Sequence, residues 1–254
     1  MAAKPPNSLS PHPVLGEYYH DAGQRRQRVD AMFDSSAPHY DWINTMMSLG
    51  SGERYRREAV ERSALEPGMT VLDVGAGTGV VSLIAQQMVT KDGLVIAHDP
   101  SRGMLEEARK SGVNRAVQGL GESLPYADNS FDRVTMGYAL RHVADLRLLF
   151  AEFARVLKPG GQLLVLEITR PENIVARSIL RVYMRAVVPT ITRVLRGSAE
   201  AQELMRYYWD TIEYCVPPAA IIDAMNDVGL EQCQRRVELG MFSDYSAKKA
   251  AAAC

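Results

Sequence analysis

VLDVGAGTGV, residues 71–80, is the stretch of this 254-residue sequence that decides the fold. A short apolar run meets an acid at Asp73, and glycines occupy every second position from 75 to 79. Glycine tolerates a left-handed backbone and lets other groups approach closely, so the pattern predicts a buried strand, a tight loop and the start of a helix. The spacing G-x-G-x-G places Val80 where a dinucleotide-binding loop carries its third glycine, which counts against a pyrophosphate ligand.

Short apolar runs alternate with helical patterns around this loop. We expect strands at 71–74, 94–99, 114–118, 131–140 and 162–168, and helices at 80–88, 103–110 and 146–157. Such alternation predicts parallel strand pairing through right-handed crossovers. A later helix opened by Pro217-Pro218 precedes two short segments, 231–237 and 239–245, that read as strands. The expected fold is therefore α/β: a doubly wound, Rossmann-like, mostly parallel sheet with an antiparallel C-terminal edge.

The remaining segments suggest how the chain is organised. Residues 1–23 are proline-rich at their start and predict a flexible tail, and residues 247–254, ending at Cys254, predict another. Between them we expect a single domain over 24–246. Its parts are N-terminal helices (24–62, broken at Pro38 and at 49–52), a ligand-binding core (63–171), a helical lid insertion (172–216), and a C-terminal helix and strands (217–246).

The charge and composition of the chain restrict the kinds of partner and ligand that we expect for it. The formal net charge is −1, so no global basic field argues for nucleic acid. Three cysteines without Cys-x-x-Cys spacing and five scattered histidines predict neither a disulfide framework nor a metal site. With no secretory signal and no apolar run of spanning length, we expect a cytoplasmic protein. Self-association is left open.

The second predicted strand also ends in an acid. Asp99 follows Gly79 by 20 residues, where a carboxylate can accept hydrogen bonds from both ribose hydroxyls of an adenosine. In open α/β sheets, ligands bind at the carboxyl ends of the strands. The order strand, acid, glycine loop, helix, strand, acid therefore predicts a site for a nucleoside cofactor; the alternative is a tight turn with no ligand.

In this order of elements the chain resembles the class I methyltransferases that use S-adenosylmethionine, whose first motif ends D-x-G-x-G-x-G as Asp73 to Gly79 does. The resemblance implies that Asp73 and the loop hold the methionine end, that Asp99 holds the ribose, and that residues 118–132 surround the adenine. Leu120 stands where that family usually has an acidic or amide residue, so backbone groups of the next two residues are expected to contact adenine. The implied cofactor-binding residues are Asp73, Gly75, Ala76, Gly77, Thr78, Gly79, Asp99, Pro100, Met104, Gly121, Glu122 and Tyr138.

A closer resemblance lies outside the core. Residues 31–57 (AMFDSSAPHYDWINTMMSLGSGERYRR), 138–146 (YALRHVADL), 155–167 (RVLKPGGQLLVLE) and 187–197 (VVPTITRVLRG) are similar to the ubiquinone/menaquinone C-methyltransferase family. The similarity spans about residues 29–240. It implies methyl transfer from S-adenosylmethionine to a ring carbon of a prenylated hydroquinone.

That chemistry needs a proton acceptor, because a ring carbon becomes a good nucleophile once a neighbouring hydroxyl is deprotonated. The family's G-L-R-N-V motif reads Ala139 to Val143 here, with His142 in place of asparagine. We hypothesise that His142 is the general base and that Arg141 stabilises the developing phenolate. Tyr40 is expected in a lid over the cofactor. The alternatives are a histidine that hydrogen-bonds to a neighbour and a tyrosine that packs in the core.

The segment after the core is rich in arginine. Residues 170–196 include six arginines and a single acid, Glu172. Arg177, Arg181 and Arg185 recur every four residues. Apolar residues of the same helix form another side. The pattern predicts either a basic amphipathic helix that contacts a membrane through 174–196 or the solvated face of a lid packed over the sheet.

Three functions remain open from the sequence. The first is C-methylation of a prenylated benzo- or naphthohydroquinone. The second is O-, N- or C-methylation of another small molecule or natural product, which departures from the family at Val80, Leu120, His142 and 168–169 keep open. The third is a binding or assembly protein without turnover, and the intact glycine loop with both strand-end acids argues against it.

Overall fold

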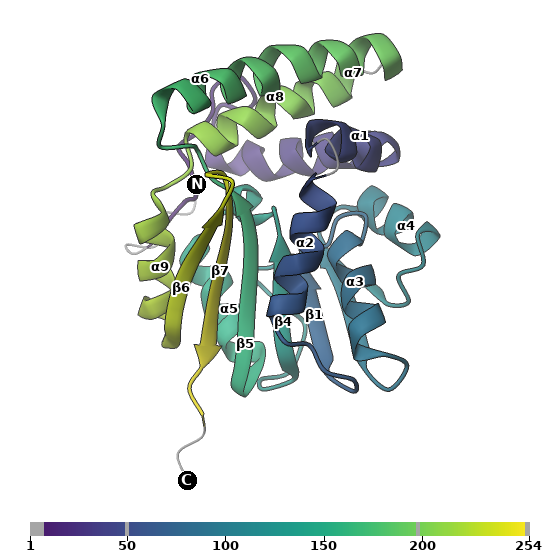
Figure 1. Ribbon diagram of the computed structural model, residues 1–254, viewed down its shortest axis with the longest axis vertical. Helices are drawn as coiled ribbons and strands as arrows, with labels where there is room; N and C mark the ends of the chain where they lie inside the picture. Colours follow the sequence, from purple (N-terminus) through teal and green to yellow (C-terminus); the bar gives the residue numbers. More distant parts are fainter. Residues whose placement is uncertain (1–7, 49–50, 197–198, 252–254) are drawn as a thin grey trace.

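A seven-stranded sheet in the order β3-β2-β1-β4-β5-β7-β6 forms the centre of the computed structural model, which describes residues 8–48, 51–196 and 199–251 (Figure 1). The strands are β1 (Thr70–Val74), β2 (Leu94–Asp99), β3 (Ala116–Gln118), β4 (Phe131–Gly137), β5 (Leu157–Ile168), β6 (Leu230–Glu238) and β7 (Phe242–Lys249). β1 to β5 pair in parallel, and β7 runs antiparallel to both β5 and β6. The predicted fold class, including the antiparallel C-terminal edge, is confirmed.

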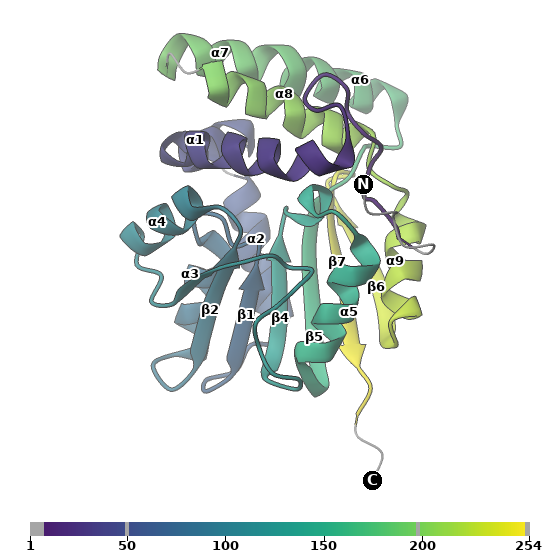
Figure 2. The same ribbon diagram turned by 180° about the vertical axis from the view of Figure 1, so that it is seen from behind.

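Helices cover both faces of this sheet and also lie above the carboxyl ends of its strands (Figure 1). They are α1 (Ala22–Ser48), α2 (Ser51–Arg62), α3 (Val80–Val89), α4 (Arg102–Lys110), α5 (Leu146–Val156), α6 (Ile174–Val182), the π-helical turn η2 (Tyr183–Val187), α7 (Val188–Arg196), α8 (Ala199–Glu213) and α9 (Pro218–Asp227). Helices α2, α3 and α4 lie on one face, and α5 and α9 lie on the other (Figure 2).

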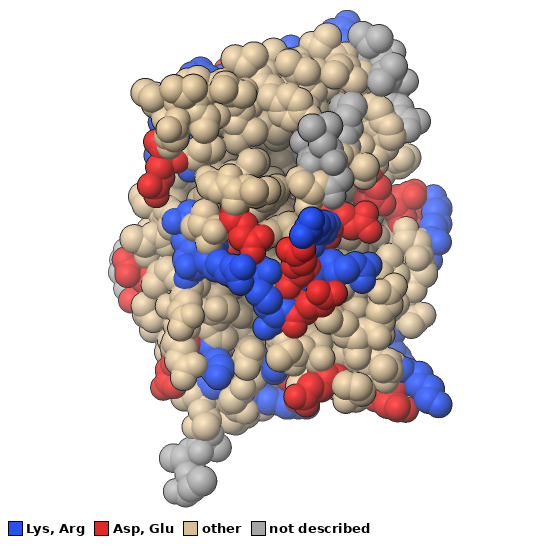
Figure 3. Space-filling view, in the orientation of Figure 1, with Lys and Arg blue, Asp and Glu red and all other residues tan. Residues whose placement is uncertain are grey.

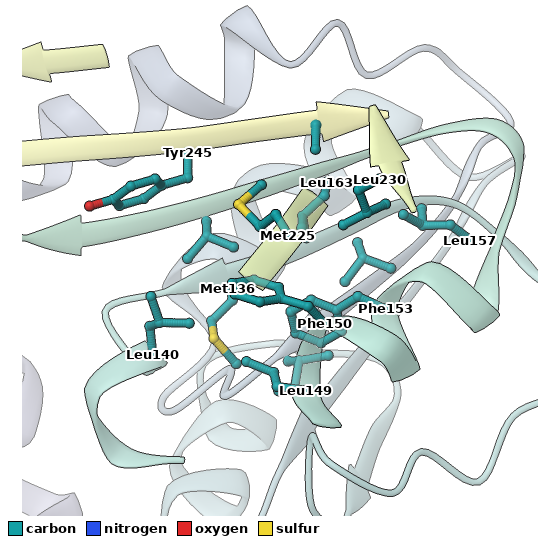
Figure 4. Packing of buried hydrophobic residues seen from close by; sticks show 14 of the residues in the cluster. Met136, Leu140, Leu149, Phe150, Phe153, Leu157, Leu163, Met225, Leu230 and Tyr245 are labelled. Carbon is teal, nitrogen blue, oxygen red and sulfur yellow. The ribbon is translucent and has the colours of Figure 1, made fainter. Parts of the chain in front are cut away.

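The largest part of the core lies under α5 and α9. Leu149, Phe150 and Phe153 follow the i, i+1, i+4 spacing of a helix face, and all three are fully buried against β4 and β5. Figure 4 shows these side chains converging with Met225 of α9. Burial of each such side chain contributes about 1.5–3 kcal/mol. This packing fixes the carboxyl ends of the strands, where the loops of the site begin.

The lid forms tiers above those strand ends. α1 crosses directly over them, α8 packs on α1, and α6 with α7 lies farthest from the sheet (Figures 1 and 2). Val29 and Met32 of α1 are buried against Leu204 and Tyr207 of α8. The lid insertion therefore covers the sheet through α1.

α1 differs from its prediction, because it runs through Pro38 without the expected break. Proline removes one helical hydrogen bond and crowds the preceding turn. Tertiary contacts hold the helix just there: Asp34 Oδ1 accepts hydrogen bonds from Ser101 Oγ (2.5 Å) and from the Gly103 N–H (2.9 Å). A Cβ on Gly103 would lie 3.0 Å from the Asp34 carbonyl oxygen, so α1 and α4 are in close contact at this point.

The N-terminal segment also differs from the flexible tail predicted for 1–23. Residues 8–21 pack along the lid and the β4–α5 loop, with His12 and Tyr19 buried. The Leu9 carbonyl accepts a hydrogen bond from the Leu146 N–H (2.9 Å), and the Pro11 carbonyl accepts one from the Val216 N–H (2.8 Å). Residues 1–7 lie outside the described part of the chain. The described segment therefore braces the loop that carries residues 139–145.

Two boundaries are corrected as well. β4 ends at Gly137, three residues before its predicted end, and Leu140–His142 form a 3-10 turn. β7 continues to Lys249, so residues 247–249 belong to the sheet and not to the predicted tail; Cys254 lies outside the described residues.

Candidate functional site

The three glycines of the β1–α3 loop have different tasks. All have left-handed backbones, with φ of +63° at Gly75, +56° at Gly77 and +87° at Gly79. A Cβ on Gly75 would lie 2.3 Å from Ala139 Cβ, and one on Gly79 would lie 2.4 Å from Val113 Cγ2. A Cβ on Gly77 would meet nothing closer than 4.0 Å. The outer glycines thus permit close packing, and the middle one leaves room for a ligand.

Two adjoining cavities open at this loop. The main cavity, about 240 Å³, lies at the carboxyl ends of β1, β2 and β4. Of the predicted cofactor residues it is lined by Gly75, Gly77, Asp99, Pro100, Met104, Gly121, Glu122 and Tyr138. The loop cavity, about 40 Å³, shares three of these and adds Asp73, Ala76 and Thr78. Gly79 lines neither cavity, because it is the N-cap residue of α3.

Asp99 links the two sides of the main cavity. Its Oδ2 accepts a hydrogen bond from the Gly77 N–H (2.8 Å), and its Oδ1 accepts one from the Ser101 N–H (2.8 Å). Burial raises the pKa of this carboxyl to about 6, although both hydrogen bonds favour the charged form. The carboxylate shapes the glycine loop and borders the cavity, where its remaining lone pairs can accept the two hydroxyls of a ribose.

Asp73 lies deeper, at the loop cavity. It is fully buried, and its oxygens accept hydrogen bonds from Ser82 Oγ (2.6 Å) and Thr135 Oγ1 (2.8 Å). These bonds tie β1 to α3 and β4. Burial raises the pKa of Asp73 to about 6. An adjoining positive group would favour its ionised form.

A histidine that was not among the predicted site residues supports the segment predicted to surround adenine. His98, fully buried in β2, hydrogen-bonds to the Tyr126 hydroxyl (3.1 Å) and the Leu120 carbonyl (3.3 Å). Leu120 lines the main cavity beside Gly121, as the sequence implied. A histidine inside an otherwise apolar strand was the available signal.

His142 borders the main cavity without a polar partner. Both ring nitrogens are buried, and neither has a hydrogen bond to any described residue. The rings of Phe33, Tyr207 and Tyr208 surround it at centroid distances of 5.0, 5.5 and 5.5 Å. Burial, reinforced by the charge of Arg141, lowers the pKa of His142 well below 6.5. The imidazole is therefore neutral at pH 7, and its residue lines the main cavity.

Arg141, which was predicted to stabilise a phenolate, lies away from the main cavity. It is fully buried and does not line the main cavity; its Nη1 donates to Glu167 Oε1 at 2.8 Å. Its guanidinium carbon lies 5.2 Å from the centroid of the Tyr208 ring. Removing either charge would strand the other in the core, at a cost of about 3–5 kcal/mol. Arg141 can act on the cavity only through its charge and through the residues that it holds.

Arg25 connects the N-terminal segment to this loop. Its Nη2 donates to the Arg141 carbonyl (3.0 Å) and to His12 Nε2 (2.9 Å), and its side chain also lines the main cavity. Neither Arg25 nor His12 could be found from the sequence, because residues 12, 25 and 141 come together only after folding.

Tyr40 lines both the main cavity and the loop cavity, in agreement with a place in the lid over the site. Its hydroxyl forms a hydrogen bond with the Tyr208 hydroxyl. The next residue, Asp41, accepts a hydrogen bond from Thr78 Oγ1 (2.5 Å). α1 is thereby joined to α8 on one side and to the glycine loop on the other. Nothing local in α8 marked Tyr207 or Tyr208 as site residues.

A third space, the lid cavity of about 190 Å³, lies between the lid and the ends of β5 and β7. Its apolar lining comprises Ile168, Leu180, Met184, Ile212, Leu239, Met241 and Phe242. Tyr138 borders all three cavities and has a left-handed backbone at φ +61°. The lid cavity therefore adjoins the main cavity at Tyr138, and it adjoins the loop cavity at Asn44, Arg56 and Tyr138.

The orientation of α6 differs from that of a lid whose arginines form its solvated face. Arg177 turns toward α8 and pairs with Glu213, and Arg185 of η2 pairs with Asp210 at 3.5 Å. The apolar side faces solvent instead, with Ile179 66% and Val182 60% exposed. The acids of α8 attract the arginines inward, so the helix turns its apolar side outward. Arg181 is exposed, and the side chain of Arg196 lies outside what the structure describes.

Within residues 8–48, 51–196 and 199–251, no three His, Cys, Asp or Glu side chains are grouped so that they could hold a metal ion. Nor does any helix in these ranges have the length and apolar character needed to cross a membrane.

Comparison with known proteins agrees with this geometry. The ubiE/COQ5 methyltransferase family matches residues 21–241. A demethylmenaquinone methyltransferase from Corynebacterium glutamicum (strain R) is 34% identical over 222 residues, which cover 87% of this chain and 94% of that protein. The ubiquinone/menaquinone biosynthesis C-methyltransferase UbiE of Shewanella piezotolerans is 32% identical over 219 residues, covering 84% and 86%.

Solved structures share the fold at lower identity. A SAM-dependent methyltransferase from Thermotoga maritima aligns with a TM-score of 0.61 at 22% identity, over 86% of this chain and 98% of that one. The cyclase SpnF aligns with a TM-score of 0.57 at 20% identity, over 89% and 97%. These likenesses establish the fold alone, since one of the two is a cyclase. The family match and the relatives above 30% identity go further: the chain belongs to the ubiE/COQ5 methyltransferase family, whose members are S-adenosylmethionine-dependent methyltransferases.

Proposed function

We propose that the protein transfers a methyl group from S-adenosylmethionine to a ring carbon of a prenylated benzo- or naphthohydroquinone. The observation that carries this proposal is His142, a neutral imidazole with no polar partner among the described side chains, set in an aromatic wall of the main cavity. The names of the relatives, demethylmenaquinone methyltransferase and ubiquinone/menaquinone C-methyltransferase, support the same acceptor class.

The cofactor would be held by the residues around the glycine loop. Asp99 would accept the ribose hydroxyls, and the backbone at Gly121 and Glu122 would border the adenine. The close approach permitted at Gly77 and the polar rim at Asp73 fit a ligand that passes from the main cavity into the loop cavity. When bound, S-adenosylmethionine supplies an electrophilic methyl group on a positively charged sulfur.

The chain's own part in the reaction is to position the ring and to move a proton. His142 would accept the hydroxyl proton next to the reacting carbon, so that the oxygen's electron pair reaches that carbon as it forms the new bond. The methylated carbon then loses its hydrogen as a proton to water, and His142 returns the first proton to the ring oxygen, which restores the aromatic hydroquinone; S-adenosylhomocysteine is the other product. Arg141 would favour the phenolate through its charge, without touching it, while Glu167 balances that charge in the core.

The prenyl tail would lie in the lid cavity, whose apolar lining adjoins the main cavity at Tyr138. Leu239, 79% exposed, borders this cavity at its outer side. Figure 3 shows few charged side chains over the α6–α7 tier and many in the band below it. We propose that the exposed apolar side of α6 rests on a membrane, from which a lipid-tailed substrate would be drawn.

The deciding experiment is a methyl-transfer assay with short-tailed demethylated quinols under reducing conditions, after titration calorimetry with S-adenosylmethionine. We expect binding of the cofactor and a product that carries the new methyl on a ring carbon, as read by mass spectrometry and NMR. Cofactor binding without transfer to any quinol would contradict the acceptor and leave the methyltransferase family intact.

A second candidate is methylation of another small phenol or natural product. It is favoured by the other departures from the family's pattern, at Val80 and at 168–169. Turnover of a tail-less phenol, together with no turnover of the prenylated quinol, would select this reading.

A further inference from the structure

The loop cavity has an acid and a base on its lining. Asp73 comes from β1, and Arg56 comes from α2. Arg56 is half-buried, and its guanidinium carbon lies 4.6 Å from the centroid of the Tyr138 ring, which supports it by a cation–π contact. The cavity is small, about 40 Å³, and joins the main cavity through Gly75 and Gly77.

Arg56 differs from the other arginines of α2 in its polar contacts. Arg54 donates to Glu58, Arg57 to Gln87 and Arg62 to Asp244. Arg56 has neither a hydrogen bond nor a carboxylate within ion-pair distance in the part of the chain that is described. A half-buried guanidinium with aromatic support and unused donors is suited to a planar carboxylate ligand, which it can bind through two parallel hydrogen bonds.

The shape of the expected cofactor makes such a ligand available at this place. If Asp99 holds the ribose in the main cavity, the amino-acid end extends toward the loop cavity. That end carries one ammonium and one carboxylate, and the cavity offers Asp73 to the first and Arg56 to the second. We propose that Arg56 binds the carboxylate of S-adenosylmethionine. This assignment rests on the cofactor of the proposed function and is independent of the methyl acceptor.

Another element could hold the carboxylate instead. Val80 and Val81, in the first turn of α3, also line the loop cavity, and the N-terminus of a helix attracts anions. The Ser82 N–H of that turn, however, is already engaged by Asp73. The experiment therefore has to separate a charge contact at Arg56 from binding by the helix end.

The test compares S-adenosylmethionine with decarboxylated S-adenosylmethionine, which lacks only the carboxylate, by titration calorimetry. In Arg56→Gln we expect the affinity for S-adenosylmethionine to fall about 10- to 100-fold, as for loss of hydrogen bonds to a charged group, while the affinity for the decarboxylated ligand stays unchanged. Arg56→Lys should recover part of the loss. Arg57→Gln, one position along the same helix and exposed, is the matched control and should change neither affinity.

Two results would overturn the assignment. Equal losses for both ligands would show that Arg56 supports the fold of the cavity, and no loss for either would leave the carboxylate to the α3 N-terminus. If the unmodified protein failed to bind S-adenosylmethionine at all, the proposed function itself would fail, and this outcome is visible before any variant is made.

Discussion

His142 owes its chemistry to its surroundings. Burial and the charge of Arg141 lower the pKa of the imidazole, so the folded protein keeps it neutral at pH values where an ordinary histidine is half protonated. A neutral imidazole is the form that accepts a proton. We therefore expect turnover to stay level through pH 6.5 and to fall only at more acid pH, as measured in a pH–rate profile.

The substitution that tests this role is His142→Asn. Removing the base should lower turnover by about 100-fold or more at pH 7, because general-base catalysis typically contributes that much. Binding of S-adenosylmethionine should be unchanged by calorimetry, since the cofactor residues are untouched. Undiminished turnover of the variant at all pH values would mean that the histidine only fills space among the aromatic rings.

Asp99 predicts a pH dependence of binding. Burial raises its pKa to about 6 in the free protein, whereas ribose hydroxyls that donate to it favour the ionised form. Affinity for S-adenosylmethionine should therefore rise as pH increases from 5 to 7, by at most tenfold per pH unit below 6. Asp99→Asn should bind more weakly at pH 7 and lose most of this rise.

The control for Asp99 is Asp92→Asn, an exposed acid in the α3–β2 turn, which should keep both affinity and slope. A slope that survives in Asp99→Asn would point to another buried acid, of which Asp73, with a pKa also raised to about 6, is the first to examine.

At the residue scale, sequence reasoning reached the groups that stand next to glycines or at strand ends. Asp73, Asp99 and the glycine loop are marked by local pattern, and the structure places all but Gly79 at a cavity. Arg25 and Tyr208 were missed because each reaches the site from a distant helix, and no period or motif records that contact. Arg141 was predicted to stabilise a phenolate from its place in a motif, but a motif gives order along the chain and says nothing about which way a side chain points.

The periodicity of the sequence predicts where a helix forms, but it does not always predict which neighbouring element each face of the helix packs against. The helix predicted at 146–157 is present as α5, and its apolar residues form the buried face, since hydrophobic burial decides that orientation. For α6 the sequence left two alternatives, a helix that contacts a membrane and a lid whose arginines form its solvated face, and the structure turns Arg177 toward α8 and the apolar side outward. Glu213 and Asp210 of α8 hold its arginines inward, and acids on a neighbouring helix cannot be read from the α6 sequence.

The outward apolar side of α6 changes what membrane binding should look like. If the exposed apolar side makes the contact, the double variant Ile179→Ser and Val182→Ser should abolish flotation with anionic vesicles, while added salt should weaken binding of the unmodified protein only modestly. Val14→Ser, 49% exposed on the N-terminal segment, is the control. Binding that persists in the double variant and disappears with added salt would show that exposed arginines such as Arg181 make the membrane contact.

The whole molecule is organised as a sheet with tiers above it, and the cavities follow that arrangement. The main and loop cavities are bordered by strand ends and by α1. The lid cavity is bordered by α6, η2 and α8 together with the β5 and β7 ends, and it shares Asn44 of α1 and Arg56 of α2 with the loop cavity. α6 buries none of its side chains fully, so we expect its amide hydrogens to exchange faster than those of the sheet.

This division predicts two separate patterns of hydrogen exchange. S-adenosylhomocysteine alone should slow exchange in α1 and in the loops at 75–79 and 119–122, because those segments border the first two cavities, and should leave α6 unchanged. Adding a quinone with a short prenyl tail should then slow α6 and η2, because the tail would occupy the space beside Leu180 and Met184. A tail-less quinone is the matched control and should not protect these helices. Protection of α6 by S-adenosylhomocysteine alone would mean that the tiers respond as one unit, and protection elsewhere by the prenylated ligand would place the tail outside the lid cavity.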